Sequence, residues 1–148
     1  MSLASTRSPL PSIALRNLIL DVEEPQGGLQ VYMPTAQVMV TRAHGNLSLQ
    51  QSEAWIHAMR PYMAKRVKIA GFHDWLEAKS YDSAARKALT EWMLSHRESV
   101  AGGWFLTASR LVAMGVTVTG TFTAFAGISM HASCDPAVFD KRLREALA

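Results

Sequence analysis

The chain has 148 residues, of which 49% are hydrophobic and 18% are charged. This length suits one domain that buries a core without metals or disulfides, and the balance excludes a disordered chain. The net charge is +3, aromatic residues are not interleaved with the basic ones, and no zinc-finger spacing is present. The sequence therefore gives no indication of nucleic-acid binding. The single cysteine, Cys134, cannot form an internal disulfide, so we expect a protein of the reducing cytoplasm.

The first 12 residues are rich in serine and proline, and we expect them to form a flexible leader before a single domain at 13–148. Apolar runs at 13–22 and 29–33 flank the turn-prone EEPQGG and predict two strands. A third strand is predicted within 36–47, where small and β-branched residues alternate. The opening of the domain is therefore predicted to be rich in β structure.

Ser48 is expected to begin a helix, because Gln51 follows three residues later as in a capping box. Pro61 is expected to end this helix early or to bend it. The apolar run VKIAGF at 67–72 predicts a short buried strand, and we expect a polar loop at 74–82 after it.

The rest of the chain alternates between helical and extended patterns. The expected elements are a helix at 82–99 stopped by Gly102 and Gly103, a strand at 104–109, a helix capped by Ser109, a strand at 126–133 and a last helix begun by Asp135 and Pro136. This order favours a sheet with a parallel portion and helices packed against it.

Residues 111–134 carry no formal charge, and such a length is enough to span a bilayer. Three glycines and several threonines and serines lie within it, so its hydropathy falls well below that of a membrane helix. The sequence predicts a buried helix followed by a central strand here, and no transmembrane segment.

The β-rich start, the alternation that follows and the Asp82-Ser83 pair at a helix start together resemble the STAS domain family, which includes the bacterial anti-sigma-factor antagonists of the SpoIIAA type. The resemblance covers roughly 29–148. It implies an α/β fold with a STAS-like (SpoIIAA-like) mixed sheet and helices packed against it. FHDW and LTASRLVAMG are similar to the broader STAS/SEC14-like superfamily, whose members need not be phosphorylated.

The resemblance implies a non-enzymatic regulatory or protein-interaction module. In STAS regulators a partner kinase phosphorylates the serine of the Asp-Ser pair, which is Ser83 here. The first backbone amides of a helix, aided by Arg86, would bind such a phosphate. Capping of the helix by Asp82 or Ser83 is the plainer interpretation of the pair. The interaction surface is predicted to consist of His73, Asp74, Trp75, Tyr81, Asp82, Ser83 and Arg86.

Two other functions stay open. SEC14-like relatives hold apolar ligands between helices and sheet, which implies a small-molecule or lipid-binding module. An enzyme would use His73, Asp74 or Ser83, since loops after parallel strands line the usual binding crevice. A deep apolar pocket beneath the third predicted helix would favour a ligand, whereas a convex, exposed segment at 73–86 would favour protein docking.

The motifs of common catalytic and cofactor sites are missing from the sequence. It contains no P-loop, dinucleotide fingerprint or nucleophile elbow, and its five histidines are dispersed. We therefore expect no catalytic residue, no cofactor and no metal site. The expected partner is a protein, such as a kinase or another regulator, and an edge strand near the start leaves a homodimer open.

Overall fold

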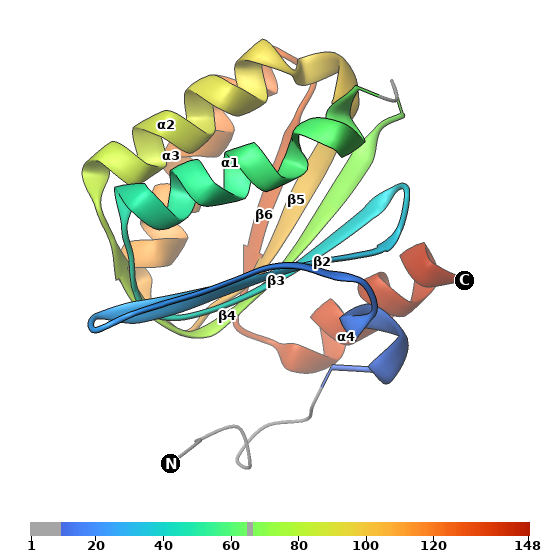
Figure 1. The fold of residues 1–148 in the computed structure, drawn as a ribbon, viewed down its shortest axis with the longest axis horizontal. Helices are drawn as coiled ribbons and strands as arrows, with labels where there is room; N and C mark the ends of the chain where they lie inside the picture. The colour runs from blue at the N-terminus through green and yellow to red at the C-terminus, as the bar shows by residue number, and fades with distance from the viewer. Residues whose placement is uncertain (1–9, 65–66) are drawn as a thin grey trace.

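A computed structural model describes residues 10–64 and 67–148 (Figure 1). Its strands are β1 (Leu18–Glu24), β2 (Gly27–Thr35), β3 (Val38–Leu47), β4 (Ile69–Tyr81), β5 (Val100–Leu106) and β6 (Ser129–Ser133). Its helices are α1 (Leu49–Met63), α2 (Ser83–Ser95), α3 (Arg110–Ala124) and α4 (Pro136–Leu147), with short 3-10 turns η2 (Ser12–Leu15) and η3 (Arg97–Ser99).

The six strands within these residues form one mixed sheet in the order of the chain, from β1 to β6. Tight turns make β1, β2 and β3 antiparallel, whereas helical crossovers make β3, β4, β5 and β6 parallel. Since each right-handed crossover adds the next strand on the same side, α1, α2 and α3 cover one face of the sheet. Helix α4 and η2 cover the other face. The predicted mixed sheet with a parallel portion is confirmed.

Side chains that alternate along the strands form a core on each face of the sheet. Met59 and Val112 pack with Phe105 under α1 to α3, and Phe72 and Leu143 pack on the side of α4. Leu10 is also buried in the second core, so the packed domain begins before residue 13. Residues 1–9 of the predicted leader lie outside the described part of the chain.

The polar loop predicted at 74–82 is wrong, because β4 continues to Tyr81. Glu77 pairs with His44, and Tyr81 pairs with Leu47 at the end of the long strand β3. The parallel neighbour supplies backbone hydrogen bonds that a polar segment needs to stay extended. The composition of this stretch gives no sign of that neighbour.

The glycine pair predicted to stop the second helix lies inside β5 instead. Helix α2 ends earlier, at Ser95, and does not reach residue 99. A Cβ on Gly102 would lie 2.6 Å from the backbone oxygen of Ser129, so glycine lets β6 approach β5 closely. Pro61 does not end α1, which continues to Met63.

Three predicted helix starts are confirmed. Ser48 and Gln51 form a reciprocal capping box at α1, and the Ser109 hydroxyl accepts a hydrogen bond from the Val112 N–H at α3. The Asp135 carboxylate accepts from the Ala137 N–H, with proline next at the first position of α4.

The uncharged stretch 111–134 forms most of α3 and all of β6, so the predicted helix and strand are both present. The prediction of a central strand is wrong, because β6 begins only at Ser129, lies at the edge of the sheet and is mostly exposed. Helix α3 is buried on one side only. Among the described helices, none has the length and apolar character needed to cross a membrane.

Candidate functional site

Asp82 joins the starts of two helices at the carboxyl edge of the parallel strands. Its carboxylate accepts hydrogen bonds from the Asn46 side-chain amide at 3.1 Å and from the Leu49 backbone N–H at 3.2 Å. The Ser80 hydroxyl donates to the side-chain oxygen of the same Asn46 amide at 2.9 Å. Asp82 therefore binds the first turn of α1 and makes no side-chain cap on α2.

Ser83 is exposed at the first position of α2, as the phosphorylation hypothesis requires. Because the Asp82 side chain does not cap this helix, it leaves the first backbone amides of α2 open to another acceptor. Arg86 lies one turn further on and is partly exposed. Four residues of the predicted interaction surface are thus at least partly exposed, namely Tyr81, Asp82, Ser83 and Arg86. The role of this surface stays a prediction.

His73, Asp74 and Trp75 were predicted to belong to the same exposed surface, but they are 4%, 3% and 5% exposed within β4. Neighbouring residues of a strand point to opposite faces, so His73 faces α1 to α3 while Asp74 faces the side of α4. Asp74 lies 3.9 Å from the Arg42 guanidinium. Roughly 25 Å of extended strand separates His73 from the end of β4, and Ser83 lies beyond that end. The three residues of the enzyme hypothesis are not brought together.

A buried chain of hydrogen bonds connects β3 and β4 beneath α1. The Trp75 indole N–H donates to the Thr41 hydroxyl oxygen at 2.9 Å, and that oxygen lies 2.7 Å from His73 Nδ1. Burial lowers the pKa of His73 to about 3, because desolvation disfavours the charged imidazolium. His73 is therefore a neutral side chain at physiological pH.

Aromatic rings and two glycines surround the His73 imidazole. Phe105 stacks on it with ring centroids 4.2 Å apart, and Trp55 and Trp75 approach edge-on at 5.5 and 5.7 Å. Gly71 and Gly103 pair across β4 and β5 on the same face, so neither residue adds a side chain beside the ring, and the imidazole lies directly over Gly71.

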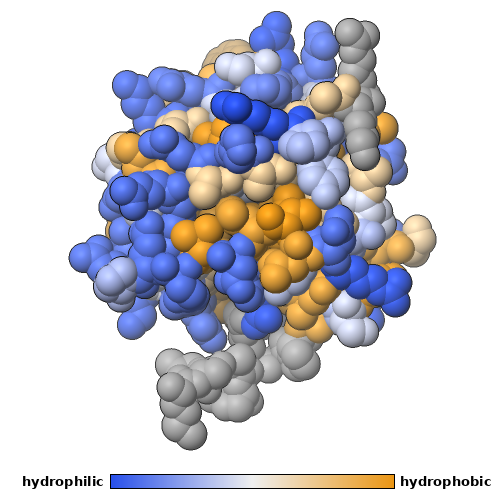
Figure 2. Space-filling model, viewed as in Figure 1, coloured by the Kyte–Doolittle hydropathy of each residue, from blue (hydrophilic) through white to orange (hydrophobic). Residues whose placement is uncertain are grey.

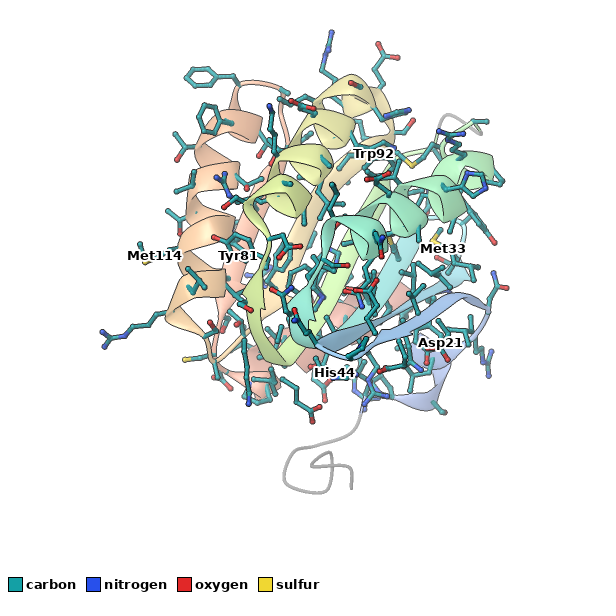
Figure 3. All side chains as sticks on the ribbon, turned by 60° about the vertical axis from the view of Figure 1, so that its left-hand side comes forward. Asp21, Met33, His44, Tyr81, Trp92 and Met114 are labelled. Carbon is teal, nitrogen blue, oxygen red and sulfur yellow. The ribbon has the colours of Figure 1, made fainter. Side chains whose placement is uncertain are left out.

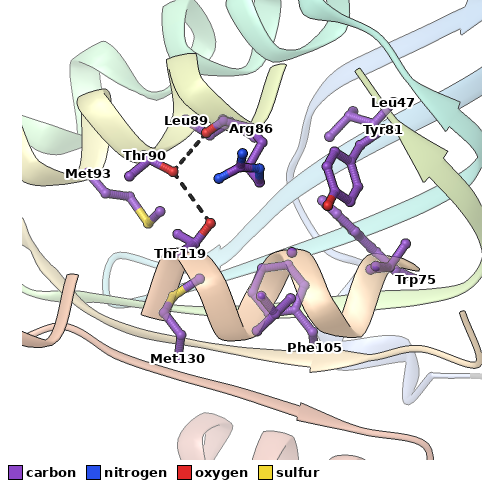
Figure 4. A pocket seen from close by; sticks show the side chains of 13 residues that line it. Leu47, Trp75, Tyr81, Arg86, Leu89, Thr90, Met93, Phe105, Thr119 and Met130 are labelled. Atoms are coloured by element: carbon purple, nitrogen blue, oxygen red, sulfur yellow. Dashed lines mark hydrogen bonds between the residues drawn. The ribbon is translucent and has the colours of Figure 1, made fainter. Parts of the chain in front are cut away.

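Two adjoining hollows lie between the sheet and its helices. The His73 hollow is lined by His73, Gly71, Gly103, Trp55 and residues of α1 and α2. The Tyr81 hollow is lined by Tyr81, Arg86, Thr119 and other residues of α2 and α3 (Figure 4). Both hollows share the same central residues, which are Trp75, Leu89, Met93, Phe105 and Met130. The predicted ligand alternative called for a deep apolar pocket under α3, and the Tyr81 hollow is an apolar space at that place.

The hollows are small in this conformation. The space open to a water-sized molecule is about 70 Å³ in the His73 hollow and about 60 Å³ in the Tyr81 hollow. Both volumes are below the roughly 150 Å³ of an engineered apolar cavity that holds benzene. A molecule of that size or larger therefore requires the helices above to move.

Helix α2 is the least firmly packed cover of these hollows. Among its residues only Ala85 is fully buried, while Leu89 and Met93 reach into both hollows. A 3.5 Å contact between the hydroxyls of Thr90 and Thr119 joins it to α3 (Figure 4). Few buried apolar contacts mean a low free energy for local displacement.

Apolar side chains also reach the surface of the helix layer. The outer side of α3 exposes a row of residues spaced three or four apart, and Met114 points away from the molecule (Figure 3). The row consists of Leu111, Met114, Val118, Phe122 and, just past the helix, Phe125. On the face seen in Figure 2, a second apolar area lies between α1 and the β1–β2 hairpin.

Thr41, Gly71 and Gly103 were not predicted from the sequence as parts of a site. The available signal is the two-residue spacing of Gly71 and His73, which places both on one face of a strand. Thr41 lies 32 residues before its partner, and nothing local indicates the contact. In the described part of the chain, no group of three histidine, cysteine or acidic side chains is arranged to hold a metal ion.

A solved structure with the same arrangement supports the fold assignment. It is that of an uncharacterized protein from the DUF3478 family with a SpoIIAA-like fold, from Shewanella loihica PV-4. The match has a TM-score of 0.62 and 14% sequence identity, and covers 86% of this chain and 99% of that chain. No protein-family model matches the sequence, and no curated protein matches it. The chain thus has the SpoIIAA-like α/β fold that the sequence predicted.

Proposed function

We propose that the protein is a non-enzymatic binding module that holds a small, largely apolar molecule between α1 to α3 and the sheet. The observation that carries this proposal is the pair of adjoining hollows with apolar walls, covered by a helix with a single fully buried residue. Apolar pockets with few polar groups are the usual form of a ligand site. Displacement of α2 would enlarge the space that the closed conformation provides.

A neutral fluorescent probe, N-phenyl-1-naphthylamine, tests this proposal. Its fluorescence should rise on binding to the wild-type protein. Leu89→Trp puts a larger side chain into both hollows and should weaken binding at least tenfold. Leu94→Trp makes the same change on α2 at a residue that lines neither hollow, and should bind like the wild type. Equal binding by all three proteins, or none by the wild type, would contradict the proposal.

A regulatory role for Ser83 is a second candidate, supported by its exposure beside open backbone amides at the start of α2. Phosphorylation by a partner kinase would add about −1.5 to −2 charges next to Asp82, whose carboxylate binds α1. Repulsion between the two groups would loosen the junction of α1 and α2 and so change the surface offered to a protein partner.

Mass spectrometry of the protein purified from its source cells tests this role. We expect a phosphate on Ser83 under some growth condition, and affinity capture with Ser83→Ala and Ser83→Asp should retain different partners. Ser95→Asp, which adds the same charge at the other end of α2, is the matched control. Absence of the modification under all conditions would count against the role.

A further inference from the structure

The two nitrogens of the His73 ring differ in their contacts with the described residues. Its Nδ1 is paired with Thr41, but no hydrogen-bond partner for Nε2 is found among the described residues. The ring is 4% exposed and lines the His73 hollow. A Cβ on Gly71 would lie 2.6 Å from Nε2 and one on Gly103 would lie 3.6 Å away, so only because both residues are glycine does no side chain of theirs contact this nitrogen.

The hydrogen bonds of Thr41 decide which ring nitrogen carries the proton. An indole N–H only donates, so the Thr41 oxygen accepts from Trp75 and its own hydrogen is left for His73 Nδ1. The proton of the neutral ring then resides on Nε2. The opposite tautomer would leave two groups without partners, the Thr41 hydroxyl hydrogen and the Nε2 lone pair, where this one leaves a single N–H.

We propose that the His73 hollow binds an uncharged, mostly apolar molecule with one hydrogen-bond acceptor, such as a ketone oxygen, and that the Nε2–H of His73 donates to it. The inference rests on the proposed ligand-binding function and specifies the ligand class. No described residue that lines this hollow carries a charge, so an ionic ligand would lose its hydration without compensation. A single donor among apolar walls selects one oriented acceptor.

Three probes of equal length distinguish a ligand with a neutral acceptor, a purely apolar ligand and an anionic ligand: octan-2-one, n-octane and octanoate. Their affinities can be measured by following amide shifts in ¹H–¹⁵N NMR spectra of the labelled protein. We expect octan-2-one to lose about tenfold in affinity in His73→Phe, while n-octane binds the variant and the wild type equally. Exposed His57 offers the control His57→Gln, which should leave both affinities unchanged.

Gly71→Ala keeps the imidazole but would place a methyl group 2.6 Å from Nε2, so the ring must shift away, and the variant should also lose the preference for the ketone. Should His73→Phe fail to fold, this variant and the wild type decide the matter. In the wild type, long-range ¹H–¹⁵N correlations should show the proton on Nε2, and its resonance should shift with octan-2-one and stay unchanged with n-octane.

Each outcome has a defined meaning. If every variant loses the same fraction of its affinity for n-octane and for octan-2-one, the role of His73 is overturned and the proposed apolar site stands. A proton on Nδ1 of the free protein, or preferred binding of octanoate that depends on Arg86, would also overturn it. Failure of all three probes to bind would remove the proposed function together with the inference.

Discussion

The carboxylate of Asp82, just before α2, accepts a hydrogen bond from the backbone N–H of Leu49, the first residue of α1. Two helices that are separated by the whole of β4 thus start from one shared contact. The same carboxylate holds Asn46 at the end of β3. The proposed phosphate on Ser83, next to Asp82, would therefore act on α1 and α2 together.

Asp82→Ala should lower the free energy of unfolding by about 1 kcal/mol, because the Leu49 N–H and the Asn46 amide lose their acceptor at a solvent-exposed site. Urea denaturation measures this change. Asp21→Ala removes an exposed carboxylate of β1 that makes no hydrogen bond with the described residues, and should alter stability by less than about 0.5 kcal/mol. Equal effects of the two substitutions would contradict the contact.

The two glycines of β5 should differ in their tolerance of a methyl group. Gly102→Ala meets the rigid backbone of Ser129 at 2.6 Å and should separate β6 from β5, with a loss of roughly 2 kcal/mol. Gly103→Ala meets side-chain atoms instead, the Met130 sulfur and a Phe105 ring carbon at 3.2 Å and His73 Nε2 at 3.6 Å, and should cost less. Thermal unfolding of both variants makes the comparison, and a more stable Gly102→Ala would refute it.

Stability should fall in acid because of His73. Its pKa is about 3 in the folded protein against 6.5 in an ordinary environment, so below pH 6.5 the unfolded chain binds a proton that the folded chain does not. This one group lowers the free energy of unfolding by about 1.4 kcal/mol per pH unit as the pH falls from 6 to 4. Urea midpoints of the wild type and of His73→Phe over this range test it. Parallel profiles would show that His73 titrates normally.

The two sides of α3 should respond differently to substitution. Met114 is 65% exposed, so Met114→Gln should change the free energy of unfolding by less than about 0.5 kcal/mol. Val112 is 2% exposed on the opposite side, and Val112→Ala should cost about 2 kcal/mol through lost burial and a residual cavity. Chemical denaturation measures both changes. A larger loss of unfolding free energy in Met114→Gln than in Val112→Ala would mean that the exposed apolar row of α3 is covered in solution.

The helix starts that depend on residues close together in the sequence were predictable. Ser48 with Gln51, Ser109 and the Asp135-Pro136 pair each satisfy backbone groups within a few residues, so their sequence pattern alone fixes three helix starts. The alternation of helices and strands also indicated the mixed sheet, because parallel strands need crossovers.

Only the tertiary structure decided which polar residues are buried and what they contact. Residues 74–81 look like a polar loop until β3 pairs with them, from Asp74 to Tyr81 with two irregularities in the register. Asp82 looks like a cap for its own helix, yet its partners are Asn46 and Leu49. The pairing of His73 with Thr41 likewise joins two strands 32 residues apart. Such contacts depend on strand register, which local propensity does not encode.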